Sequence, residues 1–307
     1  MIVDLPGTTL SQVSDRLVRL REEGGAVALG RVLTLVIETG PDEAEAAIDA
    51  ANAASREHPC RVVVVDRGNP PSNGGLDAQI RVGGDAGASE VVILRPTDLV
   101  LEEVDTLVIP LLLPDTPVVA WWTSVVPDTP SAHPIGAMAS RRITDALSCA
   151  EPLHTLERLR RSYAPGDTDL SWARCTTWRA LVAAVLDLPP YEPVTAVTVA
   201  GNARHPAPAL LAGWLADGLR CPARVVDAAS SASMTAVRLE RRHGPVTIER
   251  PDGASVATLT QPGRPAQRIV LPPRTVSDAL AEELRRIDPD EIYGRTLTHG
   301  LNQVEMP

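Results

Sequence analysis

The spacing of the hydrophobic residues changes along the chain, and this change limits the folds open to it. Before residue 165, short runs rich in Val, Ile and Leu alternate with segments of helical periodicity; the runs include 28–37, 61–66 and 117–121. Such alternation is typical of an α/β layer on a largely parallel sheet. From 233 to 271 the hydrophobic residues instead alternate with polar ones in four short stretches. That pattern predicts an antiparallel meander.

These patterns predict a two-domain chain of the α/β class. An N-terminal α/β domain with a largely parallel sheet is expected over 1–165, and a C-terminal α+β domain with the meander over 166–307. Ala164, Pro165 and Gly166 are the candidate linker. Helices are predicted at 8–23, 41–56, 98–110 (capped by Asp98), 151–163, 170–186, 208–218 and 276–287. Further strands are predicted at 79–82 and 90–94 (paired around a glycine turn), 141–147 (a short edge strand), 194–199 and 223–226.

The amino-acid composition excludes several kinds of chemistry. The chain has 307 residues, 44% hydrophobic and 22% charged, which is ordinary for a globular protein. It contains no Phe, and all 29 basic residues are Arg, a bias expected of a G+C-rich genome. Without Lys there is no Schiff base, no pyridoxal phosphate linkage and no G-x-x-x-x-G-K phosphate loop.

The charge of the chain argues against polyanionic partners. The formal net charge is −10, of which residues 1–165 carry −9 and residues 166–307 carry −1. An acidic surface repels nucleic acids and anionic membranes, so neither is an expected partner. A basic protein partner for the first half remains open beside the simpler role of the charge in solubility.

Cysteine spacing and hydropathy favour a cytoplasmic protein. The four cysteines, Cys60, Cys149, Cys175 and Cys221, contain no C-x-x-C pair, which excludes a zinc knuckle or a thioredoxin-type active site. The N-terminus lacks a basic region followed by an apolar one, and no apolar run is long enough to span a bilayer. The six His residues are scattered, and no G-x-S-x-G or H-E-x-x-H is present. We therefore expect no catalytic residues, no metal and no cofactor.

Tryptophan supplies the candidate interaction residues. Trp121 and Trp122 end a predicted strand, so their rings point to opposite faces. The rings belong either to a core or interdomain contact or to a partner-binding surface. The densest group of Trp and Arg is DLSWARCTTWR over 169–179; the predicted partner-binding residues are Trp121, Trp122, Asp169, Trp172, Arg174, Trp178 and Arg179.

The group at 169–179 has two interpretations. Asp169 can cap the helix that follows it, and Arg174 lies four residues before Trp178, a spacing that brings the two side chains together. This helix is either a structural element wedged between domains or a face that binds a protein or an anion.

Four segments together resemble one family. They are GGAVALGRVLTLV at 24–36, AASREHPCRV at 53–62, DLSWARCTTWR at 169–179 and LLAGWL at 210–215. Combined in this order, they resemble the glucose-6-phosphate dehydrogenase assembly protein OpcA family in its actinobacterial form. The resemblance implies a non-enzymatic protein that assembles or allosterically activates that dehydrogenase, which makes NADPH at the entry to the oxidative pentose phosphate pathway. In cyanobacterial relatives this role is linked to thioredoxin and cysteines. None of those cysteines can be matched to the four in this sequence, so redox control is not expected.

Two other functions remain open at this stage. The first is a sugar-phosphate sensor or enzyme, in which Arg81, Arg95, Arg141 and Arg142 would line an α/β cleft. The second is a structural module without a metabolic partner, which predicts no binding to the dehydrogenase.

Overall fold

The computed structural model describes residues 1–23, 32–71, 74–83, 90–97, 103–189 and 191–307. Contacts between Cα atoms divide the chain into two compact units. Unit 1 comprises Met1–Cys149, Gly166–Thr168 and Val276–Pro289, and unit 2 comprises Ala150–Pro165, Asp169–Thr275 and Asp290–Pro307. Each unit is thus made of three separate segments of the chain, whereas the sequence suggested a single boundary after residue 165. The assignment of domains to 1–165 and 166–307 stays a prediction.

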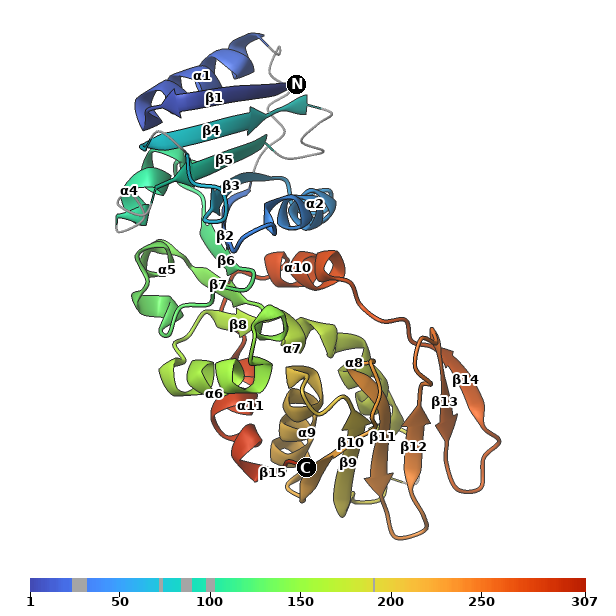
Figure 1. The fold of residues 1–307 in the computed structure, drawn as a ribbon. Coiled ribbons are helices and arrows are strands. Elements are labelled where there is room, and N and C mark those ends of the chain that lie inside the picture. Colours follow the sequence, from blue (N-terminus) through green and yellow to red (C-terminus); the bar gives the residue numbers. More distant parts are fainter. Residues whose placement is uncertain (24–31, 72–73, 84–89, 98–102, 190) are drawn as a thin grey trace. The chain divides into compact units, whose positions relative to one another are not determined.

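Unit 1 is built on an eight-stranded sheet in the order β1-β4-β5-β3-β2-β6-β7-β8 (Figure 1). Its strands are β1 (Ile2–Thr8), β2 (Leu33–Thr39), β3 (Cys60–Asp66), β4 (Leu76–Arg81), β5 (Glu90–Pro96), β6 (Val118–Trp122), β7 (Arg141–Thr144) and β8 (Asp167–Asp169). The strands from β5 through β3, β2 and β6 to β7 pair in parallel, whereas β4 pairs antiparallel with both β1 and β5. The predicted largely parallel sheet is confirmed.

Helices cover both faces of this sheet. They are α1 (Leu10–Glu23), α2 (Ala44–Ala54), α4 (Val104–Val108), η2 (Ile109–Leu111), η3 (Pro130–Ala132), α5 (Pro134–Met138), η4 (Ala146–Ser148) and α10 (Val276–Leu284). Figure 1 shows α4 and α5 on one side and α2 and α10 on the other, where α2 and α10 pack together. Every residue of β2 and β3 is consequently buried, as the unbroken apolar runs predict.

Unit 2 carries a seven-stranded sheet in the order β14-β13-β12-β11-β9-β10-β15. Its strands are β9 (Ala196–Gly201), β10 (Ala223–Asp227), β11 (Met234–Glu240), β12 (Val246–Glu249), β13 (Val256–Thr260), β14 (Gln267–Val270) and β15 (Val304–Glu305). The four strands β11 to β14 pair antiparallel in sequence order, which confirms the predicted meander. The pairs β9–β10 and β10–β15 are parallel.

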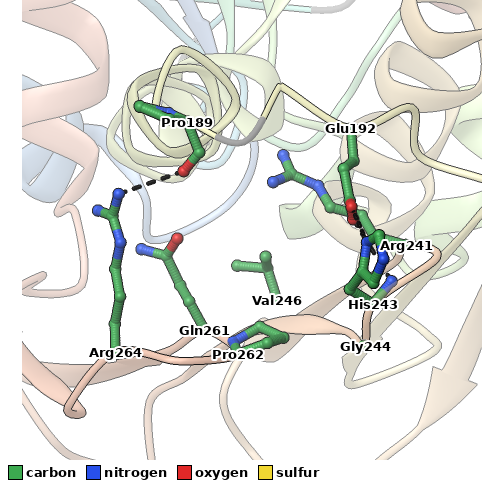
Figure 2. A pocket seen from close by; sticks show the side chains of 9 residues that line it. All are labelled: Pro189, Glu192, Arg241, His243, Gly244, Val246, Gln261, Pro262 and Arg264. Carbon is green, nitrogen blue, oxygen red and sulfur yellow. Dashed lines mark hydrogen bonds and ion pairs between the residues drawn. The ribbon is translucent and has the colours of Figure 1, made fainter.

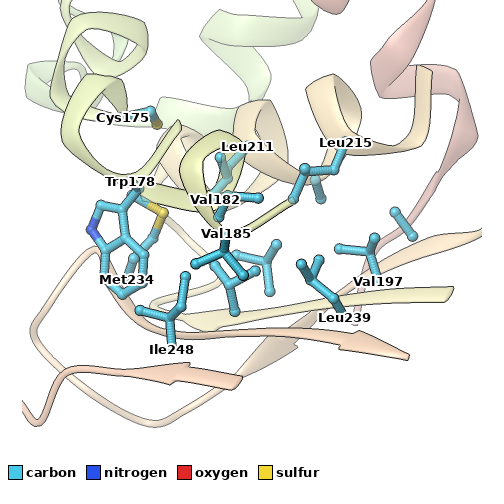
Figure 3. Close-up of a cluster of buried hydrophobic side chains, with 14 of the residues drawn as sticks. Cys175, Trp178, Val182, Val185, Val197, Leu211, Leu215, Met234, Leu239 and Ile248 are labelled. Atoms are coloured by element: carbon cyan, nitrogen blue, oxygen red, sulfur yellow. The ribbon is translucent and has the colours of Figure 1, made fainter. Parts of the chain in front are cut away.

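The helices of unit 2 bury apolar residues in two clusters. They are α6 (Pro152–Ser162), α7 (Leu170–Arg174), α8 (Thr176–Leu186), α9 (Pro206–Leu219), α11 (Glu291–Thr298) and η5 (Gly300–Gln303). Of these, α8 and α9 bury apolar residues against the seven-stranded sheet, and α6, α7 and α11 bury theirs in a second cluster with α9. Figure 3 shows the core formed with the sheet, in which Trp178 and Val182 of α8 and Leu211 of α9 meet Met234 and Ile248 of the meander. The alternating residues of the meander thus form one wall of a closed core.

Several local predictions need correction. The strand at β7 is not an edge strand, because β8 pairs beyond it; the Asp-Thr-Asp sequence of β8 is too polar to signal a strand. The predicted helix 170–186 is interrupted at Cys175, between α7 and α8. The sequence patterns did not predict β1, α11 or β15.

Other predictions fall partly outside the described residues. The helix predicted over 98–110 is seen as α4 followed by η2, and its capping residue Asp98 lies outside them. The predicted pair 79–82 and 90–94 is confirmed as β4 and β5, although the turn residues 84–89 lie outside too.

Candidate functional site

The first candidate site lies where the parallel sheet of unit 1 changes direction. From the central strand β2, the chain adds β3 on one side and later β6 on the other. In open α/β sheets, ligands bind at the carboxyl ends of the strands at this switch point. Here the carboxyl ends of β2 and β6 carry Glu38 and Trp122, which are paired in register.

Glu38 organises a buried polar group at this edge. The Nε1 of Trp122 donates a hydrogen bond of 2.8 Å to Glu38 Oε2, and the Nε of Arg67 lies 2.5 Å from Oε1. The imidazole of His133 lies 3.5 Å from Oε2 and edge-on to the Trp122 ring. Burial lowers the pKa of His133, and the Glu38 carboxylate opposes this shift. The Trp122 indole is therefore a hydrogen-bonded core side chain.

Glu43 closes the same edge from the start of α2. Its Oε2 accepts hydrogen bonds from the backbone N of Gly40 at 3.1 Å and from the hydroxyls of Thr123 at 2.5 Å and Ser124 at 2.8 Å. Backbone N–H groups and hydroxyls near a helix start are the donors that a bound phosphate uses in other α/β proteins. In this chain an internal carboxylate accepts those hydrogen bonds.

Trp121, the neighbour of Trp122 on β6, is buried as well. Its side chain is 2% exposed, and its strand position pairs with Ile37 of β2 and Ile143 of β7. Within the described ranges, its Nε1 makes no hydrogen bond. The two adjacent Trp rings are therefore both enclosed, as a sheet covered on both faces allows.

The remaining predicted residues lie around α7 and α8 in unit 2. Asp169 caps α7 as expected: its Oδ1 accepts a 2.8 Å hydrogen bond from the backbone N of Ser171. Trp172 is buried in a cluster with Tyr293, and its Nε1 donates a 2.8 Å hydrogen bond to Asp290 Oδ2. Trp172 therefore ties α7 to the start of α11.

The break at Cys175 changes which cations meet which rings. Because α8 starts afresh after Cys175, the guanidinium of Arg179 lies 3.6 Å from the centre of the Trp172 ring. The guanidinium of Arg250, from the meander, lies 5.2 Å from the centre of the Trp178 ring. The contact of Arg174 with Trp178 stays a prediction. Helical spacing could not predict either contact, since one spans a helix break and the other spans two elements.

The structure thus separates the seven predicted partner-binding residues into two classes. The four Trp side chains and Asp169 are buried, whereas Arg174 and Arg179 are partly exposed. The structure brings Trp172 and Arg179 together in unit 2 and places Trp121 and Trp122 in unit 1. A role of these residues in partner binding stays a prediction. Sequence reasoning missed Glu38 and Glu43, whose signal was a carboxylate directly at, or shortly after, the end of a buried strand.

The four Arg residues of the sugar-phosphate alternative all face carboxylates of unit 1. Arg95 Nε lies 3.2 Å from Asp66 Oδ2, and Arg81 forms two hydrogen bonds with Glu45. The buried ion pairs of the other two are Arg141–Glu283 and Arg142–Asp167. Each of the four guanidinium groups on which that alternative depends is therefore already paired with a carboxylate of the chain.

A reactive thiol, a group of metal ligands or a membrane-spanning helix among the described residues would each indicate a further function. Burial raises the pKa of the Cys175 thiol to about 12 and also raises that of Cys221, whereas reactive thiols have a lowered pKa. No group of three or more His, Cys, Asp or Glu side chains in the described ranges is placed to hold a metal ion. None of the helices described is both long and apolar enough to cross a membrane.

Comparison with family models gives two matches, one for each half of the chain. Residues 51–161 match the model for the N-terminal domain of the glucose-6-phosphate dehydrogenase subunit. Residues 165–297 match the model for the C-terminal domain of the same glucose-6-phosphate dehydrogenase subunit. Both models carry the family name OpcA. The comparison with curated proteins finds no match.

Proposed function

Because this chain belongs to the OpcA family, whose domains are those of a glucose-6-phosphate dehydrogenase subunit, we propose that it is a non-enzymatic partner of that dehydrogenase. It acts in the cytoplasm as an assembly factor and allosteric activator, and it tunes NADPH production in the oxidative pentose phosphate pathway. The observation that carries this proposal is the match of both halves, in order, over residues 51–297.

The switch-point edge of unit 1 supports a role without catalysis. A catalytic or cofactor site needs hydrogen-bond donors directed at the ligand. In this chain, Glu38 and Glu43 accept the hydrogen bonds of Trp122, Thr123 and Ser124. The two carboxylates at the edge where this fold class binds ligands thus accept hydrogen bonds from the protein itself, which suits a scaffold that presents a surface.

The mechanism proposed is linkage between binding and the state of the enzyme. A protein that binds one conformational or oligomeric state of the dehydrogenase better than another shifts the population toward that state. The shift is limited by the difference in affinity for the two states. Activation needs no chemical group from this chain.

Among the predicted partner-binding residues, the buried ones support the fold and the partly exposed ones are accessible to a partner. The buried residues Trp172 and Asp169 hold α7 in place, and Arg179 lies over the Trp172 ring with its side chain partly exposed. Arg is enriched among the residues that carry most of the binding energy at the centre of protein interfaces. We therefore assign Arg174 and Arg179 as the partner-facing members of the set.

The test is a dehydrogenase assay on the cognate enzyme, at several substrate concentrations, with increasing amounts of this protein. A saturable change in rate or apparent KM, together with co-elution of the two proteins, is expected. Arg179→Ala should weaken binding, by about 2 kcal/mol if Arg179 is a central anchor. The matched control Arg238→Ala removes an exposed guanidinium on β11 and should leave binding unchanged.

Two outcomes would contradict the proposal. Unchanged kinetics without co-elution would favour a structural module that has no metabolic partner. Normal binding by the Arg174→Ala and Arg179→Ala variants, alone and combined, would place the interface elsewhere on the chain.

A further inference from the structure

A cavity in unit 2 lies outside every site considered above. Its volume is about 290 Å³, near the lower end for small-molecule sites. It lies between the segment that precedes β9, represented by Pro189 and Glu192, and the residues that follow β11 and β13. Figure 2 shows Arg264 and Gln261 on one side of this space and Arg241, Glu192 and His243 on the other.

Two side chains of the cavity wall carry buried donors that are not matched by acceptors. Arg241 is 8% exposed and Gln261 is 7% exposed. In the part of the chain that the structure describes, Arg241 Nε and Nη2 and Gln261 Nε2 make no hydrogen bond. A buried donor without a partner is costly, particularly on a charged group. Such groups indicate a missing ligand or an ordered water.

The chemistry of these donors favours an oxyanion over a neutral ligand. Nε and Nη2 form one edge of the guanidinium, and this edge can donate two parallel hydrogen bonds to a carboxylate or a phosphate. The charges of the cavity wall also favour an anion, because the wall includes two guanidinium groups, of Arg241 and Arg264, and one carboxylate, of Glu192.

The one carboxylate of the wall already has a partner. Glu192 pairs with the His243 imidazole and accepts a 3.4 Å hydrogen bond from the His243 backbone N. Arg264 is anchored across the cavity by its 3.2 Å hydrogen bond to the carbonyl oxygen of Pro189. The pKa of Glu192 is lowered by His243 and, to a smaller extent, by the charge of Arg241, but Arg241 Nε and Nη2 make no hydrogen bond in the described residues.

The rest of the wall is apolar, with Pro189, Val246 and Pro262 lining the cavity. A pocket with apolar walls and a few convergent donors suits a small organic molecule with one anionic group. We propose that this cavity binds a small organic acid or phosphate monoester, whose oxyanion is held by Arg241 and Gln261. The site does not depend on binding to the dehydrogenase.

The test measures binding to the full chain without any partner protein. Inorganic phosphate, glycerol phosphate and succinate are titrated separately by calorimetry and by thermal unfolding, with sodium chloride at matched ionic strength as the reference. At least one of the three anions should bind and raise the melting temperature. The phosphate and succinate arms separate the two sources of the oxyanion, and the difference between phosphate and glycerol phosphate measures the contribution of the organic body.

Arg241→Met keeps the length of the side chain and removes its donors. We expect it to weaken anion binding on the order of tenfold or more. The matched control Arg238→Met, on strand β11, should bind as the wild type does. Should Arg241→Met not fold, Gln261→Leu removes one uncharged donor of the same site and should weaken binding several-fold.

The proposal is overturned if none of the three anions binds the wild type more tightly than chloride, which would mean that only water meets these donors. It is also overturned if Arg241→Met and Gln261→Leu both bind the anion with wild-type affinity. Because no dehydrogenase is present, either result leaves the proposed function to its own test.

Discussion

The switch-point edge of unit 1 and the cavity of unit 2 differ in how their buried polar groups are paired. In unit 1, Glu38 and Glu43 accept the hydrogen bonds of the groups around them. In unit 2, Arg241 and Gln261 have donors without an acceptor among the described residues. The unit 1 edge also holds buried atoms without a hydrogen bond, among them His133 Nδ1. The two regions therefore differ in their central groups, which are satisfied carboxylates in unit 1 and a guanidinium and an amide with unpaired donors in unit 2.

Unit 1 also contains a buried ion pair away from the switch-point edge. Arg61 and Glu90 begin neighbouring parallel strands, and their side chains lie 3.1 Å apart with at most 5% exposure. Arg61 also donates a 2.6 Å hydrogen bond to the carbonyl oxygen of Leu111. A buried pair of this kind costs desolvation, and removing one partner leaves a charge without compensation. The pairs of unit 1 are thus structural, and their loss should be severe.

The largest expected effect tests this contrast directly. Glu90→Leu should destabilise the protein by about 3–5 kcal/mol, because the buried guanidinium of Arg61 loses its carboxylate. Arg241→Met should change the free energy of unfolding by less than about 1 kcal/mol in the absence of an anion, because it removes donors that were already unmatched. Urea denaturation followed by tryptophan fluorescence measures both. Equal losses in the two variants would break the comparison.

The prediction of intermediate size concerns how closely the backbone of unit 2 is packed. A Cβ added to Gly213 of α9 would lie 3.0 Å from backbone atoms of Gly300 and Leu301 in η5. Gly213→Ala should therefore cost about 1–3 kcal/mol through overpacking. A Cβ on Gly218 of the same helix meets nothing within 4 Å. Gly218→Ala should be neutral or stabilise by up to about 1 kcal/mol.

Thermal and urea unfolding measure the free energy of unfolding of these two glycine variants. If Gly213→Ala proves harmless, α9 and η5 can separate more easily than the structure implies. The contrast between the units would then include backbone packing as well as polar pairing.

The smallest expected effect concerns pH at the edge of unit 1. Burial lowers the pKa of His133 below its usual value of 6.5. The unfolded chain therefore binds a proton at this imidazole more readily than the folded chain does. The contribution of neutral His133 to the free energy of unfolding is fully present above pH 6.5, and it is lost as the pH falls from 6.5 through the lowered pKa of the folded state. His133→Phe keeps a ring beside Trp122 and removes the titration. Its free energy of unfolding should fall less between pH 7 and pH 5.5 than that of the wild type, and parallel curves would contradict the assignment.

Local sequence patterns predicted most of the framework. The β-branched run 61–66 predicted β3, and the alternation over 233–271 predicted the four strands of the meander. These patterns work because a strand's exposure repeats every second residue, or is uniform when both faces are covered. The Asp169 cap was equally predictable, since a side chain that bonds its own helix start is a local interaction.

What the sequence by itself determined about this protein is therefore its class, its main elements and its family, because each depends on neighbours along the chain. Tertiary structure decided the partners of its charges and rings. Arg250 reaches Trp178 from another element, Arg141 meets Glu283 from a helix far along the chain, and Arg241 meets no acceptor among the described residues. The physical reason is that ion pairs and ring contacts depend on distance in space, which spacing along the chain does not specify.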